Sequence, residues 1–291
     1  MDWTKAKTIL IVVFLVTNLI LGGTLVRQKS LNGSSAVSDV YLDQTLAFLE
    51  DQGVVLDTQI PRQAPELASV TVEYRFFSPY ETAEKLLGSD VIQVAPDTFE
   101  NDRGRVSVVN DKRLKYQRFT QEDPLPDLQE ATLQSRAESF LKEHDLFPER
   151  LHLQQIYVGM VQEYDSEPLH KLVFEQTYRD RFIGESYVHV YLNRKGLVAV
   201  EALLLTPPGE ESQAGTARPM ISAPEALLRK LEDIINTQEG RNIIVSRVEP
   251  GYYFDLTRDP MTQWDAVASG TAVPAWKIVL KNGDTYYQEA F

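Results

Sequence analysis

The chain has no cysteine among its 291 residues. No disulfide can therefore cross-link the fold, no thiol is available as a nucleophile or for redox chemistry, and no lipid can be attached at a cysteine. The stability of the folded part has to come from a hydrophobic core. The roughly 260 residues that follow the amino-terminal segment are enough to bury one or two cores of ordinary size.

Histidine is scarce, with four residues in the whole chain. No two of them have the His-x-x-x-His or His-x-x-Glu-His spacing that directs two imidazoles at one metal ion. We expect ordinary hydrogen bonding for His144 and His189, and we predict no metal site and no cofactor.

The motifs of common catalytic sites are lacking as well. Ser186 follows a glycine two residues earlier, but the second glycine of a Gly-x-Ser-x-Gly nucleophile elbow is absent. No glycine-rich loop is present that would hold a phosphate group. The 42 acidic residues supply too many carboxylate pairs for any one of them to indicate acid and base catalysis. We therefore predict no catalytic residues and a protein that is not an enzyme.

Basic residues are in deficit, with 29 Lys and Arg against 42 Asp and Glu and a net charge of −13. Residues 1–29 carry +3, so the rest of the chain carries −16. An acidic surface is repelled by nucleic acid and by anionic lipid headgroups, and we expect this part of the chain to bind neither.

One long uncharged segment is present, residues 8–26, with basic residues on both sides. A helix of this length, at about 1.5 Å per residue, nearly matches the roughly 30 Å hydrocarbon thickness of a bilayer. We predict a retained transmembrane helix, a cytoplasmic head at residues 1–7, a flexible tether at 27–37 and an extracytoplasmic body. The alternative is a cleaved signal peptide, but the segment is long for one, basic residues follow it, and the one candidate cleavage site, at 34–36, is poor.

Within this segment, Asn18 and Gly22 lie four residues apart and therefore on one helix face, flanked by Leu15 and Leu25. An asparagine in hydrocarbon is costly unless it is paired, and a glycine lets another helix approach closely. We predict that these four residues bind a partner's transmembrane helix. In the alternative, the asparagine is satisfied by its own backbone and the glycine is an ordinary feature of membrane helices.

Helical and strand patterns alternate after the tether, which predicts an α+β body of helices packed on antiparallel sheets. We expect a first domain at residues 38–123 and a second at 124–291. The second shows a weak helix-plus-strands repeat at about 127–205 and 222–291.

Apolar spacing and capping signals predict helices at 38–53, at 78–88, from 127 and from 222. Alternation and turn signals predict strands at 70–74, 105–110, 114–119, 151–161, 172–178, 187–192, 197–204, 242–248, 276–280 and 285–290. Hairpin turns are expected at 193–196 and 282–284.

Two groups of adjacent aromatic residues stand out in predicted strands, at 252–254 and 286–287. Neighbouring side chains of a strand point to opposite faces, so one member of each group should face solvent or a partner. We predict partner contacts at Tyr253 and Tyr287.

Both ends of the chain resemble a known family. The chain begins with MDWTKAKTI, directly before the apolar segment, and ends with Pro-Ala-Trp-Lys at 274–277, Asn-Gly-Asp at 282–284 and Tyr286-Tyr287. In these features, and in lacking cysteine, it resembles the YycI family, which are membrane-anchored regulatory proteins of Gram-positive bacteria. Its last hairpin is also similar to that of PepSY-type modules.

The resemblance implies a role in a two-component system. Members of the family act with a sister protein, YycH, on the sensor histidine kinase WalK. They contact its transmembrane helices and adjust signalling through WalR, which governs cell-wall metabolism. Two other functions stay open at this point: a PepSY-like extracytoplasmic binding or inhibitory module, and a cell-wall enzyme with convergent titratable groups in a pocket.

Overall fold

The computed structural model describes residues 37–120, 123–148, 150–206, 213–238, 242–254 and 267–291. The predicted transmembrane helix at 8–26 lies outside them, together with its face of Leu15, Asn18, Gly22 and Leu25. None of the helices in the described ranges is long and apolar enough to cross a membrane.

Among the described residues, four helices lie where the sequence predicts them. They are α2 (Asp39–Asp51), α3 (Pro79–Leu87), α4 (Glu130–Glu143) and α5 (Ala223–Gln238). The Ser38 hydroxyl caps α2 by accepting a hydrogen bond from the Tyr41 amide at 3.3 Å. The capping signal at the start of the helix predicted at 78–88 is wrong in one respect, since Ser78 precedes α3 as its N-cap but its side chain makes no cap bond. With Pro79 in its first turn, α3 has one amide fewer to satisfy.

Fifteen strands of the described ranges form one hydrogen-bonded sheet, and most of their pairings are antiparallel. All ten predicted strands are confirmed, with ends shifted by a few residues. Their bounds, together with those of five strands that were not predicted, are β1 (Val54–Leu56), β2 (Glu66–Tyr74), β3 (Ile92–Ala95), β4 (Thr98–Glu100), β5 (Gly104–Val109), β6 (Arg113–Arg118), β7 (Leu151–Gly159), β8 (Leu169–Tyr178), β9 (Arg181–Asn193), β10 (Gly196–Leu203), β11 (Leu205–Thr206), β12 (Gln213–Pro219), β13 (Ile243–Tyr253), β14 (Ser269–Leu280) and β15 (Thr285–Glu289).

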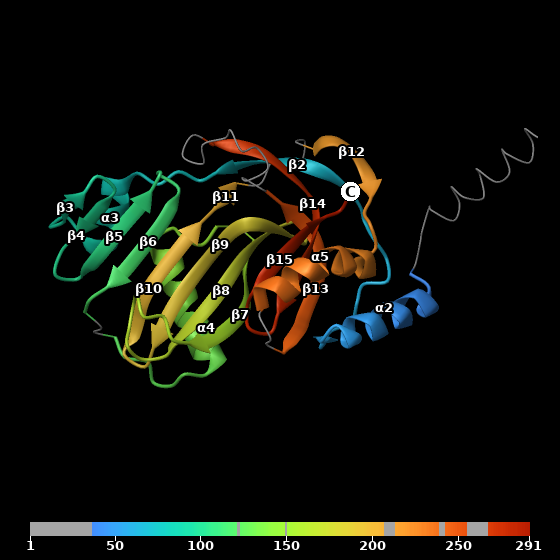
Figure 1. The fold of residues 1–291 in the computed structure, drawn as a ribbon. Helices are drawn as coiled ribbons and strands as arrows, with labels where there is room; N and C mark the ends of the chain where they lie inside the picture. The colour runs from blue at the N-terminus through green and yellow to red at the C-terminus, as the bar shows by residue number, and fades with distance from the viewer. Residues whose placement is uncertain (1–36, 121–122, 149, 207–212, 239–241, 255–266) are drawn as a thin grey trace, which may run out of the picture.

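The sheet is organised in two lobes, seen side by side in Figure 1. The large lobe contains β3–β10 with α3 and α4, and the small lobe contains β1, β2 and β12–β15 with α2 and α5. The lobes meet where β13 runs parallel to β9, through the residue pairs Gly251 with Phe182 and Tyr252 with Ile183. Backbone pairing also joins them where β11, which follows β10, pairs with β2 through Leu205 with Tyr74 and Thr206 with Glu73. Both junctions are short, and side chains add to the contact between the lobes.

Each lobe has a core of its own. In the large lobe, α4 packs against one sheet face through Leu133, Ala137 and Leu141, in a cluster that includes Leu172 and Phe174 of β8. In the small lobe, the predicted leucine stripe of α2 and the apolar face of α5 pack around Trp276 of β14. The face of β7–β9 opposite α4 is therefore free to carry polar side chains.

The predicted domain boundary between residues 123 and 124 does not coincide with a break in the sheet. Strand β6, which precedes the boundary, pairs with β10, and β2 pairs with β14. The two-domain division and the internal repeat stay predictions.

Both predicted hairpins are confirmed. Gly196 opposes Asn193 between β9 and β10, and the 282–284 turn joins β14 to β15. Gly283 has a φ of 97°, a left-handed conformation that favours glycine, and its amide donates to the Leu280 carbonyl at 3.0 Å. The second turn thereby reaches the edge of the large lobe, where it faces Tyr157.

Candidate functional site

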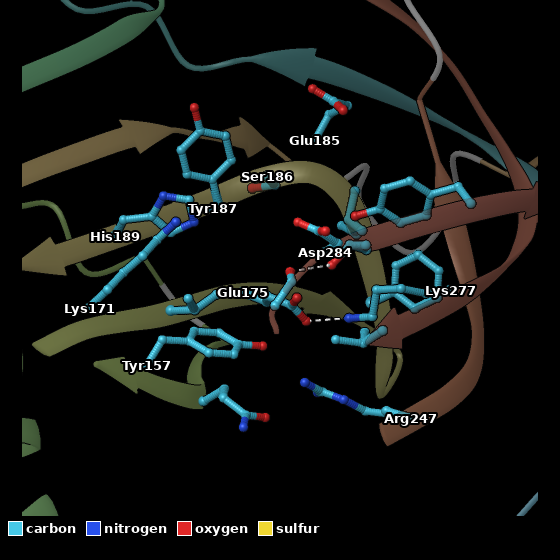
Figure 2. Close-up of a pocket in the computed structure, with 18 of the residues that line it drawn as sticks. Tyr157, Lys171, Glu175, Glu185, Ser186, Tyr187, His189, Arg247, Lys277 and Asp284 are labelled. Atoms are coloured by element: carbon cyan, nitrogen blue, oxygen red, sulfur yellow. Dashed lines mark hydrogen bonds and ion pairs between the residues drawn. The ribbon is translucent and has the colours of Figure 1, made fainter. Parts of the chain in front are cut away.

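A cleft of about 420 Å³ lies between the two lobes and is the candidate functional site. One wall consists of the β7–β9 face opposite α4, and the other of β13–β15 with the 282–284 turn (Figure 2). Its lining holds several charged side chains together with aromatic rings. Such a mixture is typical of a site that recognises a polar ligand.

The strand alternation of β8 builds the first wall. Leu172 and Phe174 are fully buried against α4, so Lys171 and Glu175 lie on the opposite face and line the cleft. Tyr157 of β7 is paired with Lys171, and its ring extends into the cleft (Figure 2). Within the described part of the chain, the Lys171 ammonium group makes no ion pair, and it lies 5.8 Å from the centre of the Tyr191 ring.

Lys277 of β14 connects the second wall to the first. Its side chain is 0% exposed, and its ammonium group forms ion pairs with Glu175 of the large lobe and with Glu249 of β13, the latter at 2.6 Å. The ammonium group also lies 4.5 Å from the centre of the Phe182 ring. Arg247 adds a second contact between the lobes by donating to Gln154 of β7. A buried lysine that crosses a lobe boundary makes the relative position of the walls depend on charge.

The structure brings the two predicted partner residues of the body together at one end of the cleft. The rings of Tyr253 and Tyr287 stack with centroids 4.2 Å apart and an interplanar angle of 12°. Burial, followed by nearby carboxylates, raises the pKa of Tyr287 well above its ordinary value. Both rings cover Gly184, where a Cβ atom would come within 2.8 Å of Tyr253 Cδ2. Their predicted role in binding a partner stays a prediction.

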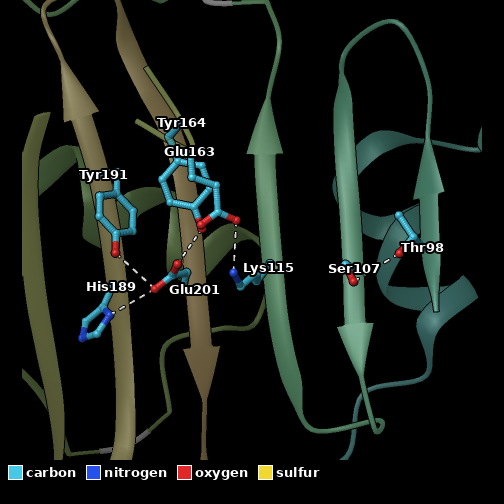
Figure 3. A network of polar contacts seen from close by, with 8 residues as sticks. All are labelled: Thr98, Ser107, Lys115, Glu163, Tyr164, His189, Tyr191 and Glu201. Atoms are coloured by element: carbon cyan, nitrogen blue, oxygen red, sulfur yellow. Dashed lines mark hydrogen bonds and ion pairs between the residues drawn. The ribbon is translucent and has the colours of Figure 1, made fainter. Parts of the chain in front are cut away.

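A polar network adjoins the cleft on the same sheet face (Figure 3). Glu201 of β10 accepts hydrogen bonds from the hydroxyls of Tyr164, at 2.5 Å, and Tyr191, at 3.1 Å, and lies 3.4 Å from His189 Nδ1. Burial opposes the charge of Glu201, but the hydrogen bonds from His189, Tyr164 and Tyr191 outweigh it and lower the pKa to about 2. Burial also lowers the pKa of His189, so a neutral imidazole is the favoured form. The expected ordinary hydrogen bonding of His189 is confirmed.

This network predicts an acid-sensitive contribution to stability. Because the folded-state pKa of Glu201 lies below its ordinary value of 4.5, ionised Glu201 stabilises the fold above that pH, and the contribution is lost as the pH falls from 4.5 to about 2. We expect Glu201→Gln to remove roughly 3 kcal/mol of this pH-dependent stabilisation. Urea unfolding between pH 2.5 and 6 measures it. Glu163→Gln, at a more exposed carboxylate, is the control; equal acid slopes for both variants and the wild type would contradict the prediction.

The other polar residues considered from the sequence have structural roles. The Ser186 hydroxyl donates to the Gln176 side chain and accepts from the Leu205 amide at 3.2 Å, which holds neighbouring strands together. His144 packs 4.4 Å from the Phe140 ring at the end of α4. No three His, Asp or Glu side chains of the described residues are placed so that they could hold a metal ion.

The sequence does not single out Lys171, Glu175 or Lys277. A usable signal exists for Lys277, which is the one charged residue between apolar neighbours in 272–280. Lysine is almost never fully buried unless it is paired, so such a position indicates a buried ion pair. Its partners cannot be identified from the sequence.

Comparison with known proteins identifies the family. The family described as YycI protein matches residues 33–291, while a comparison with curated protein sequences gives no match. An uncharacterised protein from Eubacterium rectale has a similar crystal structure, with a TM-score of 0.52 and 11% identity over 82% of this chain and 89% of that one. This likeness concerns the fold alone.

Two further solved structures are more distant. YycH from Bacillus subtilis has a TM-score of 0.46 and 8% identity over 79% of this chain and 54% of its own, and the C-terminal domain of YpeB from Bacillus megaterium has a TM-score of 0.34 and 12% identity over 73% and 92%. The assignment therefore rests on the family match, which covers the whole described body. The chain belongs to the YycI family, a family of regulatory, non-catalytic accessory proteins of the WalK system.

Proposed function

We propose that the protein is a membrane-anchored accessory regulator of a WalK-type sensor histidine kinase that controls cell-wall metabolism, and that it acts without catalysing a reaction. The observation that carries this proposal is the family match over residues 33–291. The uncharged segment at 8–26 supplies the anchor, with the amino terminus in the cytoplasm and the body outside.

In this proposal the protein makes two contacts, one through its transmembrane helix and one through its body. The helix face of Leu15, Asn18, Gly22 and Leu25 binds the transmembrane helices of the kinase. The acidic body binds a YycH-like sister protein. The charge of −16 beyond residue 29 favours a basic surface on that sister protein.

Exchanging residues 8–26 for an unrelated spanning helix tests the first contact. We expect kinase co-purification and regulation to be lost. If both survive, the segment is only an anchor. If a chain that begins at residue 31 keeps full regulation, the body acts alone, as a PepSY-like module would.

Point variants of the helix give a sharper prediction. Because one interhelical hydrogen bond contributes about 1 kcal/mol in a membrane, we expect Asn18→Leu to weaken kinase co-purification roughly fivefold, and Gly22→Leu to weaken it by blocking close approach. Val16→Leu and Thr24→Leu are matched controls. Val16 lies two positions from Asn18 and Thr24 two positions from Gly22, and each is therefore about 160° around the helix from the residue it is matched with. Equal losses for all four variants would contradict a specific contact face.

A further inference from the structure

Helix α2 carries apolar side chains on two faces, and the described part of the chain covers only one of them. The leucine stripe that includes Leu49 packs into the small-lobe core. On the other side Val40 is 67% exposed and Phe48 50%, and Tyr41 is exposed beside them. Successive helix residues are about 100° apart, so these three side chains lie within about 100° of one another. They form a stripe about two turns long, which we call the outer face of α2.

The arrangement of these side chains is that of a contact site. Single exposed apolar side chains are common on protein surfaces, whereas a row of them marks a place where another molecule binds. Tyr41 and Phe48 are seven residues apart, which is the repeat at which one helix presents side chains to a second helix. Because α2 lies on the outside of the small lobe (Figure 1), a second helix can approach its outer face.

The border of the outer face is acidic. Asp43 and Glu50, also seven residues apart, lie about 60–80° beyond one edge of the stripe, and Asp51 lies at its carboxyl end. These three carboxylates form no ion pair within the described part of the chain, whereas Asp39 is paired with Arg62. The helix contains no lysine or arginine of its own. A partner that brings cations to this border therefore finds unpaired carboxylates there.

Charge decides among the occupants that such a face could have. A membrane surface with anionic headgroups is repelled by these carboxylates. A second copy of the chain, docked through the same face, would place three carboxylates opposite three others, which is also unfavourable. An amphipathic helix of another protein, with lysine or arginine beside its apolar stripe, meets neither obstacle and matches the outer face in both shape and charge.

We propose that the outer face of α2 binds an amphipathic helix of the YycH-like sister protein, and that lysine or arginine borders the apolar stripe of that helix. This inference rests on the proposed function, from which it takes the partner, and it adds the surface and the chemistry of the contact. Twelve residues separate the predicted anchor at 8–26 from α2, a span of at most about 40 Å, so the outer face stays close to the membrane. Phe48 is expected to contribute most, because buried aromatic residues carry much of the binding energy of a contact.

Replacing the exposed ring tests the apolar part of the contact. The full chain and its sister protein are purified in detergent micelles, and their affinity is measured by biolayer interferometry. We expect Phe48→Ala to weaken binding at least tenfold. Phe119→Ala is the matched control, since it removes a ring that is 45% exposed after β6 in the large lobe, and it should leave the affinity unchanged.

Reversing the charges tests the border of the face. We expect the double variant Asp43→Lys with Glu50→Lys to weaken binding at least tenfold, and added salt to weaken the wild type more than this variant. The matched control is Glu130→Lys with Glu143→Lys, which reverses two exposed charges on α4 and should leave the affinity unchanged.

A single fluorescent label distinguishes the possible occupants. Because the chain has no cysteine, Ala47→Cys places one thiol at the edge of the outer face. With the full chain in lipid nanodiscs, a polarity-sensitive dye at this position should report water, and it should report apolar surroundings once the sister protein is added. An apolar signal before that addition means that lipid, a second copy or the amino-terminal segment covers the face, and it overturns the proposal.

The outcomes separate this inference from the proposed function. If the wild type binds the sister protein and Phe48→Ala binds it equally well, the outer face is not the contact, and the proposed function stands. If the wild type binds no sister protein, both fail. The label experiment keeps Val40, Tyr41 and Phe48 in place, so it decides the matter even if Phe48→Ala fails to fold.

Discussion

Replacing Trp276 by alanine is expected to lower the free energy of unfolding by about 3–5 kcal/mol. Trp276 is 0% exposed, and its indole N–H donates to the Ile221 carbonyl at 2.9 Å. The substitution opens a cavity between β14 and α5 and leaves that carbonyl without its partner, so a packing cost and a polar cost add together. Urea denaturation of the purified protein, followed by far-ultraviolet circular dichroism, measures the change.

Two control variants separate these costs. Trp276→Phe keeps much of the ring volume but removes the N–H donor, and we expect it to cost clearly less than the alanine variant. Phe48→Ala removes an aromatic ring that is 50% exposed on α2, and its effect should stay within about 0.5 kcal/mol. A loss below about 1 kcal/mol for Trp276→Ala would show that the core of the small lobe does not depend on this ring.

Trp276 also illustrates which parts of the fold the sequence predicts. The turn signal at 282–284 identifies β14 correctly, and apolar spacing identifies α5, because both signals are contained in short stretches of chain. The unpredicted strands include β1, β4 and β11, with three, three and two residues, which are too short to show a period. They are specified by the strands that they pair with, and those lie elsewhere in the sequence.

The cleft was harder to predict, because its residues meet only through long-range pairing. Lys277 and Glu175 are 102 positions apart in the chain, and no local pattern connects them. Tyr253 and Tyr287 were singled out as adjacent aromatics, but their stacking on Gly184 follows from the packing of three strands. An isolated glycine in a strand does indicate a close approach of other groups, and Gly184 is a second local signal at that end of the cleft.

Replacing Lys277, which follows Trp276 in β14, is expected to have the second large effect on stability. We expect Lys277→Met to lower the free energy of unfolding by about 3 kcal/mol at pH 7, because it leaves Glu175 and Glu249 close together without the buried cation that pairs with both. Lys281→Met is the matched control, since that lysine is 63% exposed and its pair with Asp57 should contribute less than about 1 kcal/mol.

A double variant distinguishes loss of charge balance from loss of packing. If the cost of Lys277→Met comes from unpaired carboxylates, adding Glu175→Gln should restore most of the lost stability, because a buried ion pair can be replaced by neutral side chains at little cost. If the cost comes from the shape of the lysine stem against Phe182, the second substitution should add a further loss. The interaction energy from this double-mutant cycle therefore reports how the two lobes are held together. If Glu175→Gln restores the stability lost in Lys277→Met, charge holds the cleft walls in place. A ligand that carries charges of its own can then compete for the same contacts.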